Sequence, residues 1–332
     1  MNEKTMDKLI REFPGNITEA IKIAGEARLR EPQSEIRNVV VCGMGGSGIG
    51  GKIVSQWVYN DLEVPFTLVN DYVLPAFVNE NTLLIASSYS GNTEETLSAV
   101  EDGLSKGAHI VAVCSGGKLQ AMAEEKSFDV IVVPGGNPPR ASLAFSLVQL
   151  VSILEKLELV TIRYSAQLEK SVELLLANES KIKEEAIEIA DFLFEKMPII
   201  YSTSLFEGVA IRTRQQLNEN AKTLCWHHVI PEMNHNELVG WSGGDKRFAS
   251  LFLINSDIYE RNAFRLSVSK KVMEEKGAGT MVVYSKGESR VEEAIYFIHL
   301  VDWVSFYLSE KNKVDPIAIP VIDYLKGELE RL

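Results

Sequence analysis

The fold is decided by one stretch of the sequence, Val39-Val-Val-Cys-Gly-Met-Gly-Gly-Ser-Gly48-Ile-Gly-Gly51. Its first four residues are an unbroken apolar run of strand length, and the glycines behind them predict a tight turn into a helix. In such a context main-chain N–H groups and the helix dipole can hold a phosphate. The stretch therefore predicts the first strand of an α/β domain with an anion site at its end.

Further apolar runs alternate with helical stretches in the first half of the chain. These runs are residues 39–42, 66–69, 83–86, 110–113 and 130–133. Unbroken β-branched runs suit strands that are covered on both faces, as in a parallel sheet with crossover helices. Before them, we expect Asn16 to cap a helix that runs to about residue 30. Residues 1–156 are predicted to form a doubly wound α/β domain.

The second half repeats this pattern after a long charged helix over about residues 165–196. Strands are predicted at 198–201, 248–253 and 280–284, and helices at 259–276 and 291–309. We therefore expect a second α/β domain over residues 157–332. Its first strand and helix, from residue 199 on, echo residues 39–48 without the glycine loop. This echo indicates an internal duplication, although a generic strand-turn-helix unit would look the same.

Charge and cysteine content narrow the classes of partner and compartment. The chain has 332 residues, with 46 acidic against 34 basic ones and a formal charge of −12. This charge disfavours nucleic acid and anionic membranes as partners. Cys42, Cys114 and Cys225 lie far apart, which fits neither a disulfide framework nor a cysteine zinc site. With no signal-like start and no apolar stretch near the ~18 residues of a membrane span, we expect a cytoplasmic protein.

Two loops indicate different ligands for the anion site, a dinucleotide or a sugar phosphate. Gly43 to Gly48 also reads G-x-G-x-x-G, so a dinucleotide site is considered, with Asp71 as the ribose-binding acid. The second loop, Ser87-Ser-Tyr-Ser-Gly-Asn-Thr93, offers short hydroxyls and a glycine turn that suit one phosphate monoester. A dinucleotide needs no such second cradle, which favours a sugar phosphate. The alternative is that Thr93 merely caps the helix that follows.

The two loops together resemble a known module. Gly45-Gly-Ser-Gly48 with Ser88-Tyr-Ser-Gly-Asn-Thr93 is similar to the sugar isomerase (SIS) domain, a phosphosugar-binding module. The resemblance implies two flavodoxin-like α-β-α sandwich domains with mainly parallel sheets. It also implies a set of phosphate contacts, namely Gly46, Ser47, Ser88, Ser90 and Thr93.

The likeness extends over nearly the whole chain to the bifunctional phosphoglucose/phosphomannose isomerases of archaea and bacteria. The segments that carry it beyond the two loops are Asn137-Pro-Pro-Arg140, Asn218-Glu-Asn-Ala-Lys222, Asn234-His-Asn-Glu237, Asp315-Pro316 and Leu325-Lys326. The family implies a cytoplasmic enzyme of glycolysis and gluconeogenesis that interconverts glucose 6-phosphate and mannose 6-phosphate with fructose 6-phosphate. It implies no cofactor and no metal.

The family also implies a role for each candidate catalytic residue. Glu219 is implied as the base that moves a proton between C1 and C2, since a carboxylate can both remove and return it. His235 is implied as the ring-opening group, and it is expected to come from the neighbouring subunit of a homodimer. Arg140 would stabilise the enediolate, for which a fixed cation is needed. Lys326 is expected near the sugar ring.

Other interpretations stay open. Glu219 could be an ordinary solvated acid, His235 could be a hydrogen-bonded loop histidine, and Arg140 could pair with a surface carboxylate. The same module could serve a non-catalytic phosphosugar sensor, and the glycine loop could serve an NAD-linked oxidoreductase. A metal site near His227, His228 and His235 is disfavoured because adjacent strand residues face opposite sides.

The chain departs from the family at one place. Where members often carry a hydroxyl residue after the carboxy-terminal Asp-Pro, this sequence has Ile317-Ala-Ile319. The departure bears on whether mannose 6-phosphate is accepted as well as glucose 6-phosphate.

Overall fold

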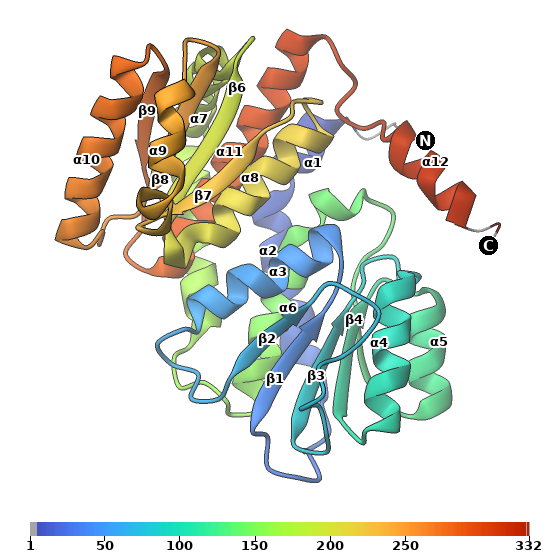
Figure 1. Ribbon diagram of the computed structural model, residues 1–332. Coiled ribbons are helices and arrows are strands. Elements are labelled where there is room, and N and C mark those ends of the chain that lie inside the picture. The colour runs from blue at the N-terminus through green and yellow to red at the C-terminus, as the bar shows by residue number, and fades with distance from the viewer. Residues whose placement is uncertain (1–4, 330, 332) are drawn as a thin grey trace. The chain divides into compact units, whose positions relative to one another are not determined.

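The computed structural model describes residues 5–329 and 331, which fall into two compact units (Figure 1). The N-terminal unit comprises residues 12–177 and 287–296. The C-terminal unit comprises residues 5–11, 178–286, 297–329 and 331. Two long helices, α7 (Tyr164–Leu193) and α11 (Arg290–Asn312), contribute residues to both units. The expected domain boundary between residues 156 and 157 stays a prediction.

The N-terminal unit is built on a five-stranded parallel sheet. Its strands are β1 (Asn38–Cys42), β2 (Phe66–Val69), β3 (Thr82–Ser87), β4 (His109–Cys114) and β5 (Asp129–Val132). They lie in the order β2-β1-β3-β4-β5, and every neighbouring pair is parallel. This is the order of a flavodoxin-like doubly wound sheet. The fold class expected from the apolar runs is confirmed, and each strand matches its run to within one residue at either end.

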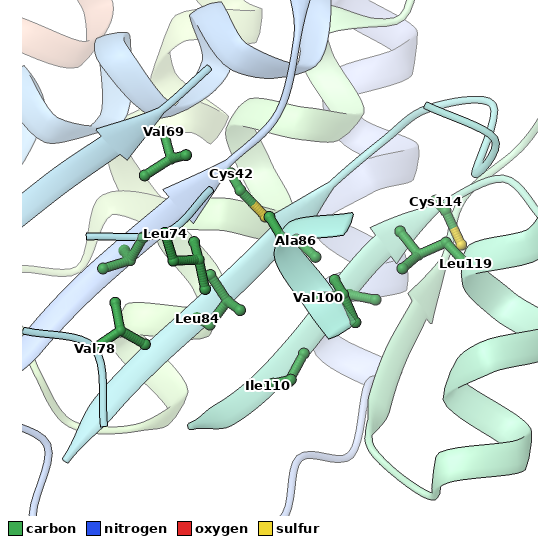
Figure 2. Packing of buried hydrophobic residues seen from close by; sticks show 13 residues of the cluster. Cys42, Val69, Leu74, Val78, Leu84, Ala86, Val100, Ile110, Cys114 and Leu119 are labelled. Atoms are coloured by element: carbon green, nitrogen blue, oxygen red, sulfur yellow. The ribbon is translucent and has the colours of Figure 1, made fainter. Parts of the chain in front are cut away.

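Helices cover both faces of this sheet. They are α2 (Phe13–Glu26), α3 (Gly45–Trp57), α4 (Glu94–Ser105), α5 (Gly117–Lys126), the short 3-10 helix η1 (Pro139–Ala141) and α6 (Leu143–Lys156). Figure 2 shows the packing on the face toward α4 and α5, where Cys42, Leu84 and Ile110 of the strands meet Val100 and Leu119 of the helices. Because alternate strand residues point to opposite faces, the residues between them face α3 and α6. A Cβ on Gly51 of α3 would lie 2.9 Å from Cγ1 of Val41, so α3 rests directly on the sheet.

The C-terminal unit has a second parallel sheet. Its strands are β6 (Met197–Thr203), β7 (Trp226–Ile230), β8 (Phe248–Ile254) and β9 (Gly279–Tyr284), in the order β7-β6-β8-β9. Numbered within each sheet, both sheets share the order 2-1-3-4, and the first sheet adds a fifth strand. The shared order supports the internal duplication. As expected for the second copy, β6 leads into the 3-10 helix η2 (Ser204–Phe206) rather than a glycine loop.

The remaining helices belong to the C-terminal unit. They are α1 (Met6–Arg11), α8 (Glu207–Glu219), η3 (Glu232–His235), α9 (Glu237–Gly240), η4 (Trp241–Gly243), α10 (Glu260–Glu275) and α12 (Pro320–Leu329). On one face of the sheet, Tyr201 and Phe252 stack with ring centroids 4.9 Å apart inside a core that also holds Met233, Trp241 and Met273. Among the described residues, no helix is both long and apolar enough to cross a membrane.

Two local expectations differ from the structure. Asn16 does not cap α2, because the helix begins three residues earlier at Phe13, with Pro14 in its first turn, and ends at Glu26. A proline in the first turn loses no hydrogen bond and has a helical φ already, which explains the earlier start. Strand β7 was not among the predicted strands. Its run Trp-His-His is only partly buried at a sheet edge, so it lacks the apolar run used as a signal.

The far end of α3 is anchored by Asp61. Its carboxylate accepts hydrogen bonds from the main-chain N–H of Thr161 at 3.0 Å and of Ile162 at 3.0 Å, and from the hydroxyl of Tyr164 at 3.2 Å. Burial acts to raise the pKa of Asp61, but these hydrogen bonds and that of the Thr161 hydroxyl outweigh it and lower the pKa. The ionised carboxylate thus holds the α6–α7 connection against the helix that carries the glycine turn.

We expect Asp61→Asn to lower the free energy of unfolding by about 1.5–3 kcal/mol at pH 7, the usual worth of a hydrogen bond to a charged group. A carboxylate whose pKa is lowered by folding stabilises the fold above its unfolded-state pKa of about 3.9. This stabilisation is lost as the pH falls through the folded-state pKa. The difference between wild type and variant should therefore shrink below about pH 4. Urea unfolding across pH measures this. Asp71→Asn, in an exposed loop, is the matched control, and an equal loss in both variants would contradict the assignment.

Candidate active site

At Gly43 and Gly46 the turn after β1 comes close to the backbone of neighbouring segments. A Cβ on Gly43 would lie 2.6 Å from the carbonyl oxygen of Ser87 at the end of β3, and a Cβ on Gly46 would lie 3.2 Å from the carbonyl oxygen of Pro139. Both distances are too short for an unstrained contact, so side chains at these positions would push the loops apart. The turn therefore brings the N-terminus of α3 against the ends of β3 and of the segment behind β5.

The same turn is held by Asn70, which sequence reasoning missed. Its Nδ2 donates a 2.6 Å hydrogen bond to the carbonyl oxygen of Gly43. Asn70 directly follows β2, and β2 lies beside β1 in the sheet. The available signal was its position, because a polar residue at the carboxyl end of a parallel strand faces the ligand edge. The sequence indicated the next residue, Asp71, as a possible ribose-binding acid, but its Oδ1 accepts a hydrogen bond from the N–H of Tyr72.

The start of α3 is suited to an anion. The amides of Ser47 and Gly48 donate to the carbonyl oxygen of Met44 at 3.0 and 3.1 Å, which leaves the two preceding amides to face a ligand. The first turn of α3 contains no acidic residue, whereas that of α4 contains Glu94 and Glu95. Since carboxylates already complement the dipole of α4, α3 is the stronger anion site of the two.

The serine loop is a rigid turn between β3 and α4. Gly91 has φ of +67°, and its amide donates to the carbonyl oxygen of Ser88 at 2.9 Å. The hydroxyls of Ser88 and Thr93 share a 2.8 Å hydrogen bond, and the Ser90 hydroxyl accepts from the amide of Asn92 at 3.2 Å. Thr93 occupies the position before α4, but its side chain makes no capping bond. The reading of Thr93 as a simple helix cap is therefore wrong for its hydroxyl.

Tyr89 joins three loops of the site, and sequence reasoning gave it no role. Its amide donates to the Ser47 hydroxyl at 3.1 Å, so the serine loop is tied to the start of α3. Its hydroxyl donates to the carbonyl oxygen of Pro134 at 3.0 Å and accepts from the amide of Asn137 at 3.3 Å. The glycine turn, the serine loop and the segment that leads to Arg140 are therefore held together by the main chain and side chain of one residue.

Arg140 lies in η1 at this same edge of the sheet. It is 3% exposed, and a Cβ on Gly46 would lie 3.5 Å from its amide nitrogen. The structure thus brings Gly46, Ser47, the serine loop and the backbone of Arg140 together where the strand order reverses between β1 and β3. This is where open α/β sheets bind their ligands. The cavity of about 10 Å³ lined by Gly46, Ser47, Tyr89 and Pro139 has room for one water at most, so it is too small for a phosphate.

The other predicted catalytic residues belong to the C-terminal unit. Glu219 is the last residue of α8 and precedes the start of β7, whereas His235 ends η3 beyond the far end of β7 and is exposed. The five residues of β7 span about 16 Å. Within this unit the structure therefore does not bring Glu219 and His235 together. Lys326 is exposed on α12, a helix that buries none of its residues.

A buried polar ladder fixes the rotation of α8. Arg212 and Gln216, four residues apart, both donate to Asp302 of α11, at 3.0 Å and 2.7 Å. Asn220, another four residues on, donates to the hydroxyl of Ser305 at 2.9 Å. Burial acts to raise the pKa of Asp302, while Arg212 and Gln216 oppose that shift. Because the three residues lie on one face of the helix, they determine the direction in which Glu219 leaves its end.

The histidines near β7 have local partners. His227 Nε2 lies 4.0 Å from Oε1 of Glu207, and His228 Nδ1 accepts from the amide of Val229 at 2.7 Å. Both lie within β7, whose adjacent residues point to opposite faces. Across residues 5–329 and 331, no group of three or more His, Cys, Asp or Glu side chains is arranged to hold a metal ion.

Comparison with known proteins places the fold first. The chain is similar to the C-terminal domain of a glucosamine-fructose-6-phosphate aminotransferase from Francisella tularensis, with a TM-score of 0.77 at 15% identity over 96% of this chain and 99% of that one. Residues 182–329 match the family described as bacterial phospho-glucose isomerase C-terminal SIS domain. The fold is therefore that of the SIS class of proteins.

Two relatives narrow the family. The chain is 37% identical to the bifunctional phosphoglucose/phosphomannose isomerase of Caldicellulosiruptor bescii over 98% of this chain and 99% of that protein. It is 36% identical to the enzyme of the same name from Aquifex aeolicus over 89% of this chain and 91% of that protein. The chain belongs to the bifunctional phosphoglucose/phosphomannose isomerase family, as its motifs indicated.

We expect Gly91→Ala to disrupt the serine loop. Its Cβ would lie 1.7 Å from the carbonyl oxygen of Gly116, on top of the strain that alanine meets at positive φ. Binding of a hexose 6-phosphate, measured by calorimetry, should weaken at least about tenfold. Gly107→Ala is the matched control, because Gly107 also has positive φ but open space around it. It should lose only about 1 kcal/mol of stability and keep its affinity. Equal affinity in both variants would show that the serine loop does not hold the ligand.

We expect Asp302→Ala to destabilise the C-terminal unit by about 3–5 kcal/mol, because it leaves the Arg212 guanidinium buried without its carboxylate. Urea unfolding measures this loss. The double variant Arg212→Met/Asp302→Leu should recover most of it, since an apolar pair leaves no buried charge. Glu310→Ala, on the exposed face of the same helix, is the control. A loss no larger for Asp302→Ala than for Glu310→Ala would contradict the role of the ladder.

Proposed function

We propose that this protein is an aldose–ketose isomerase that interconverts glucose 6-phosphate and mannose 6-phosphate with fructose 6-phosphate through a cis-enediol intermediate. The observation that carries the proposal is identity of 37% with a bifunctional phosphoglucose/phosphomannose isomerase along the whole chain. The anion site at α3, together with the serine loop, supports it, because both suit a single phosphate monoester. The relatives favour neither the phosphosugar sensor nor the NAD-linked oxidoreductase.

We propose a role in binding or catalysis for each predicted site residue. The N-terminal unit would bind the phosphate through Gly46, Ser47, Ser88, Ser90 and Thr93. Arg140 would supply the fixed positive charge for the enediolate, which is most effective in a site from which water is excluded; its side chain is buried.

The proton transfer is assigned to the C-terminal unit. Glu219 would remove the proton from one carbon and return it to its neighbour. His235 would open the sugar ring, and Lys326 would lie near it. What supports the carboxylate assignment is that the buried ladder of α8 leaves Glu219 at a helix end of defined direction.

We further propose a cytoplasmic homodimer in which His235 reaches the site of the neighbouring subunit. The supporting observation is the separation of Glu219 and His235 by the length of β7 within one chain. Two chains related by a two-fold axis can exchange such exposed segments reciprocally. In this arrangement each site would combine residues of both subunits.

The test measures the incorporation of solvent deuterium into the substrate. In D₂O, wild-type enzyme should place deuterium at C1 or C2 of each hexose 6-phosphate, as NMR detects. We expect Glu219→Gln to lower kcat by about 10²–10⁴-fold, the usual contribution of a general base, with little change in KM. Glu207→Gln, at the other end of the same helix, is the control. Retention of more than a few per cent of turnover by Glu219→Gln would overturn the assignment of the base. Ligand binding by the wild type without any turnover would instead favour the sensor.

A further inference from the structure

Lys222 lies in the turn after α8, and its ammonium group contacts three main-chain carbonyl oxygens. Nζ donates to the carbonyl oxygen of Glu219 at 2.6 Å, of Asp315 at 2.7 Å and of Ala318 at 2.8 Å. An ammonium group has three N–H donors and no acceptor, so three carbonyls match its whole donor set. One side chain therefore ties the end of α8 to the segment between α11 and α12.

The backbone at Lys222 is one that side chains rarely adopt. Its φ is +54°, in the left-handed region where glycine is favoured because a Cβ crowds the following carbonyl. The turn it makes lets the amide of Thr223 donate to the carbonyl oxygen of Leu217 at 3.0 Å. A glycine would make this turn without strain, but it could not make the three contacts of the lysine side chain.

A second side chain reinforces the same corner from α11. Nδ2 of Asn312, the last residue of α11, donates to the carbonyl oxygen of Ala221 at 2.9 Å and to the hydroxyl of Thr223 at 3.0 Å. Residues 219–223 are thus held on one side by the end of α11 and on the other by residues 315–318. Segments almost a hundred residues apart in the chain share one rigid corner.

We propose that Lys222 is a positioning residue of the isomerase, which holds the main chain of Glu219 and the segment 315–318 at one fixed separation. The proposal rests on the proposed function, in which Glu219 is the base. Glucose 6-phosphate and mannose 6-phosphate differ only in configuration at C2, the carbon from which that base removes the proton. Because the C2–H bonds of the two epimers point in different directions, a shift of the base acts unequally on proton transfer from them. Phosphate binding depends on other residues.

The test compares Lys222→Met with Lys313→Met. Lys313 is the matched control because it also has positive φ, at +56°, and is exposed. It lies in the connection between α11 and α12, the segment that Lys222 contacts. We expect Lys222→Met to lower kcat by about 10- to 100-fold, since a misplacement of about 1 Å can cost this much, while KM for fructose 6-phosphate changes less than about threefold. The ratio of glucose 6-phosphate to mannose 6-phosphate turnover should also change, and Lys313→Met should match wild type.

A second measurement covers loss of the fold. Hydrogen exchange of intact variants should rise at residues 313–319 in Lys222→Met and stay unchanged in Lys313→Met. If Lys222→Met unfolds, Lys222→Arg serves in its place, since a planar guanidinium cannot match three carbonyls in the same way and should show the same kcat loss. Wild-type kcat, epimer ratio and exchange in a folded Lys222 variant would overturn the positioning role. Absence of isomerase activity in wild type and Lys313→Met would overturn the proposed function instead.

Discussion

At Gly43 the turn that follows β1 has space for main chain alone, and the arrangement of the N-terminal site depends on this constraint. Gly43 approaches the end of β3 so closely that a Cβ would meet the Ser87 carbonyl at 2.6 Å. That approach places the first amides of α3 beside the serine loop, where the amide of Tyr89 donates to the Ser47 hydroxyl. Two loops that are forty residues apart thus form one surface of N–H and hydroxyl groups. A phosphate needs only such neutral donors when they are aimed and held in advance.

In the C-terminal unit, side-chain hydrogen bonds orient the end of helix α8. This unit has no glycine turn after its first strand, and the end of α8 is oriented by buried hydrogen bonds from Arg212, Gln216 and Asn220 to α11. Buried charged groups cost desolvation energy, so such a ladder is tolerated only when nearly every donor finds an acceptor. The two sheets share the strand order 2-1-3-4, yet one unit is suited to hold an anion and the other to orient a carboxylate.

The strands and the two glycine- and hydroxyl-rich turns could be predicted because their signals are local. Apolar β-branched runs located eight of the nine strands, and glycine with hydroxyl residues marked the two loops. Strand β7 was not predicted, because an edge strand with two histidines has no apolar run. The start of α2 was predicted wrongly, because Asn16 is a typical capping residue, whereas the helix begins earlier with Pro14 in its first turn, a position that accepts proline. Tyr89, Asn70 and Lys222 were missed since their partners are main-chain atoms of distant segments, which no local pattern reveals.

The amino-acid sequence by itself determined the class of fold, the two loops rich in glycine and hydroxyl residues, and the family, because strand periodicity, glycine turns and motif order are properties of short segments. Tertiary structure alone decided which hydroxyl and amide groups share one edge of the sheet. It also decided that the Thr93 hydroxyl meets Ser88 instead of capping α4, and that Glu219 and His235 stand at opposite ends of β7. The physical reason is that hydrogen bonds between distant segments exist only after hydrophobic burial has packed the helices on their sheets.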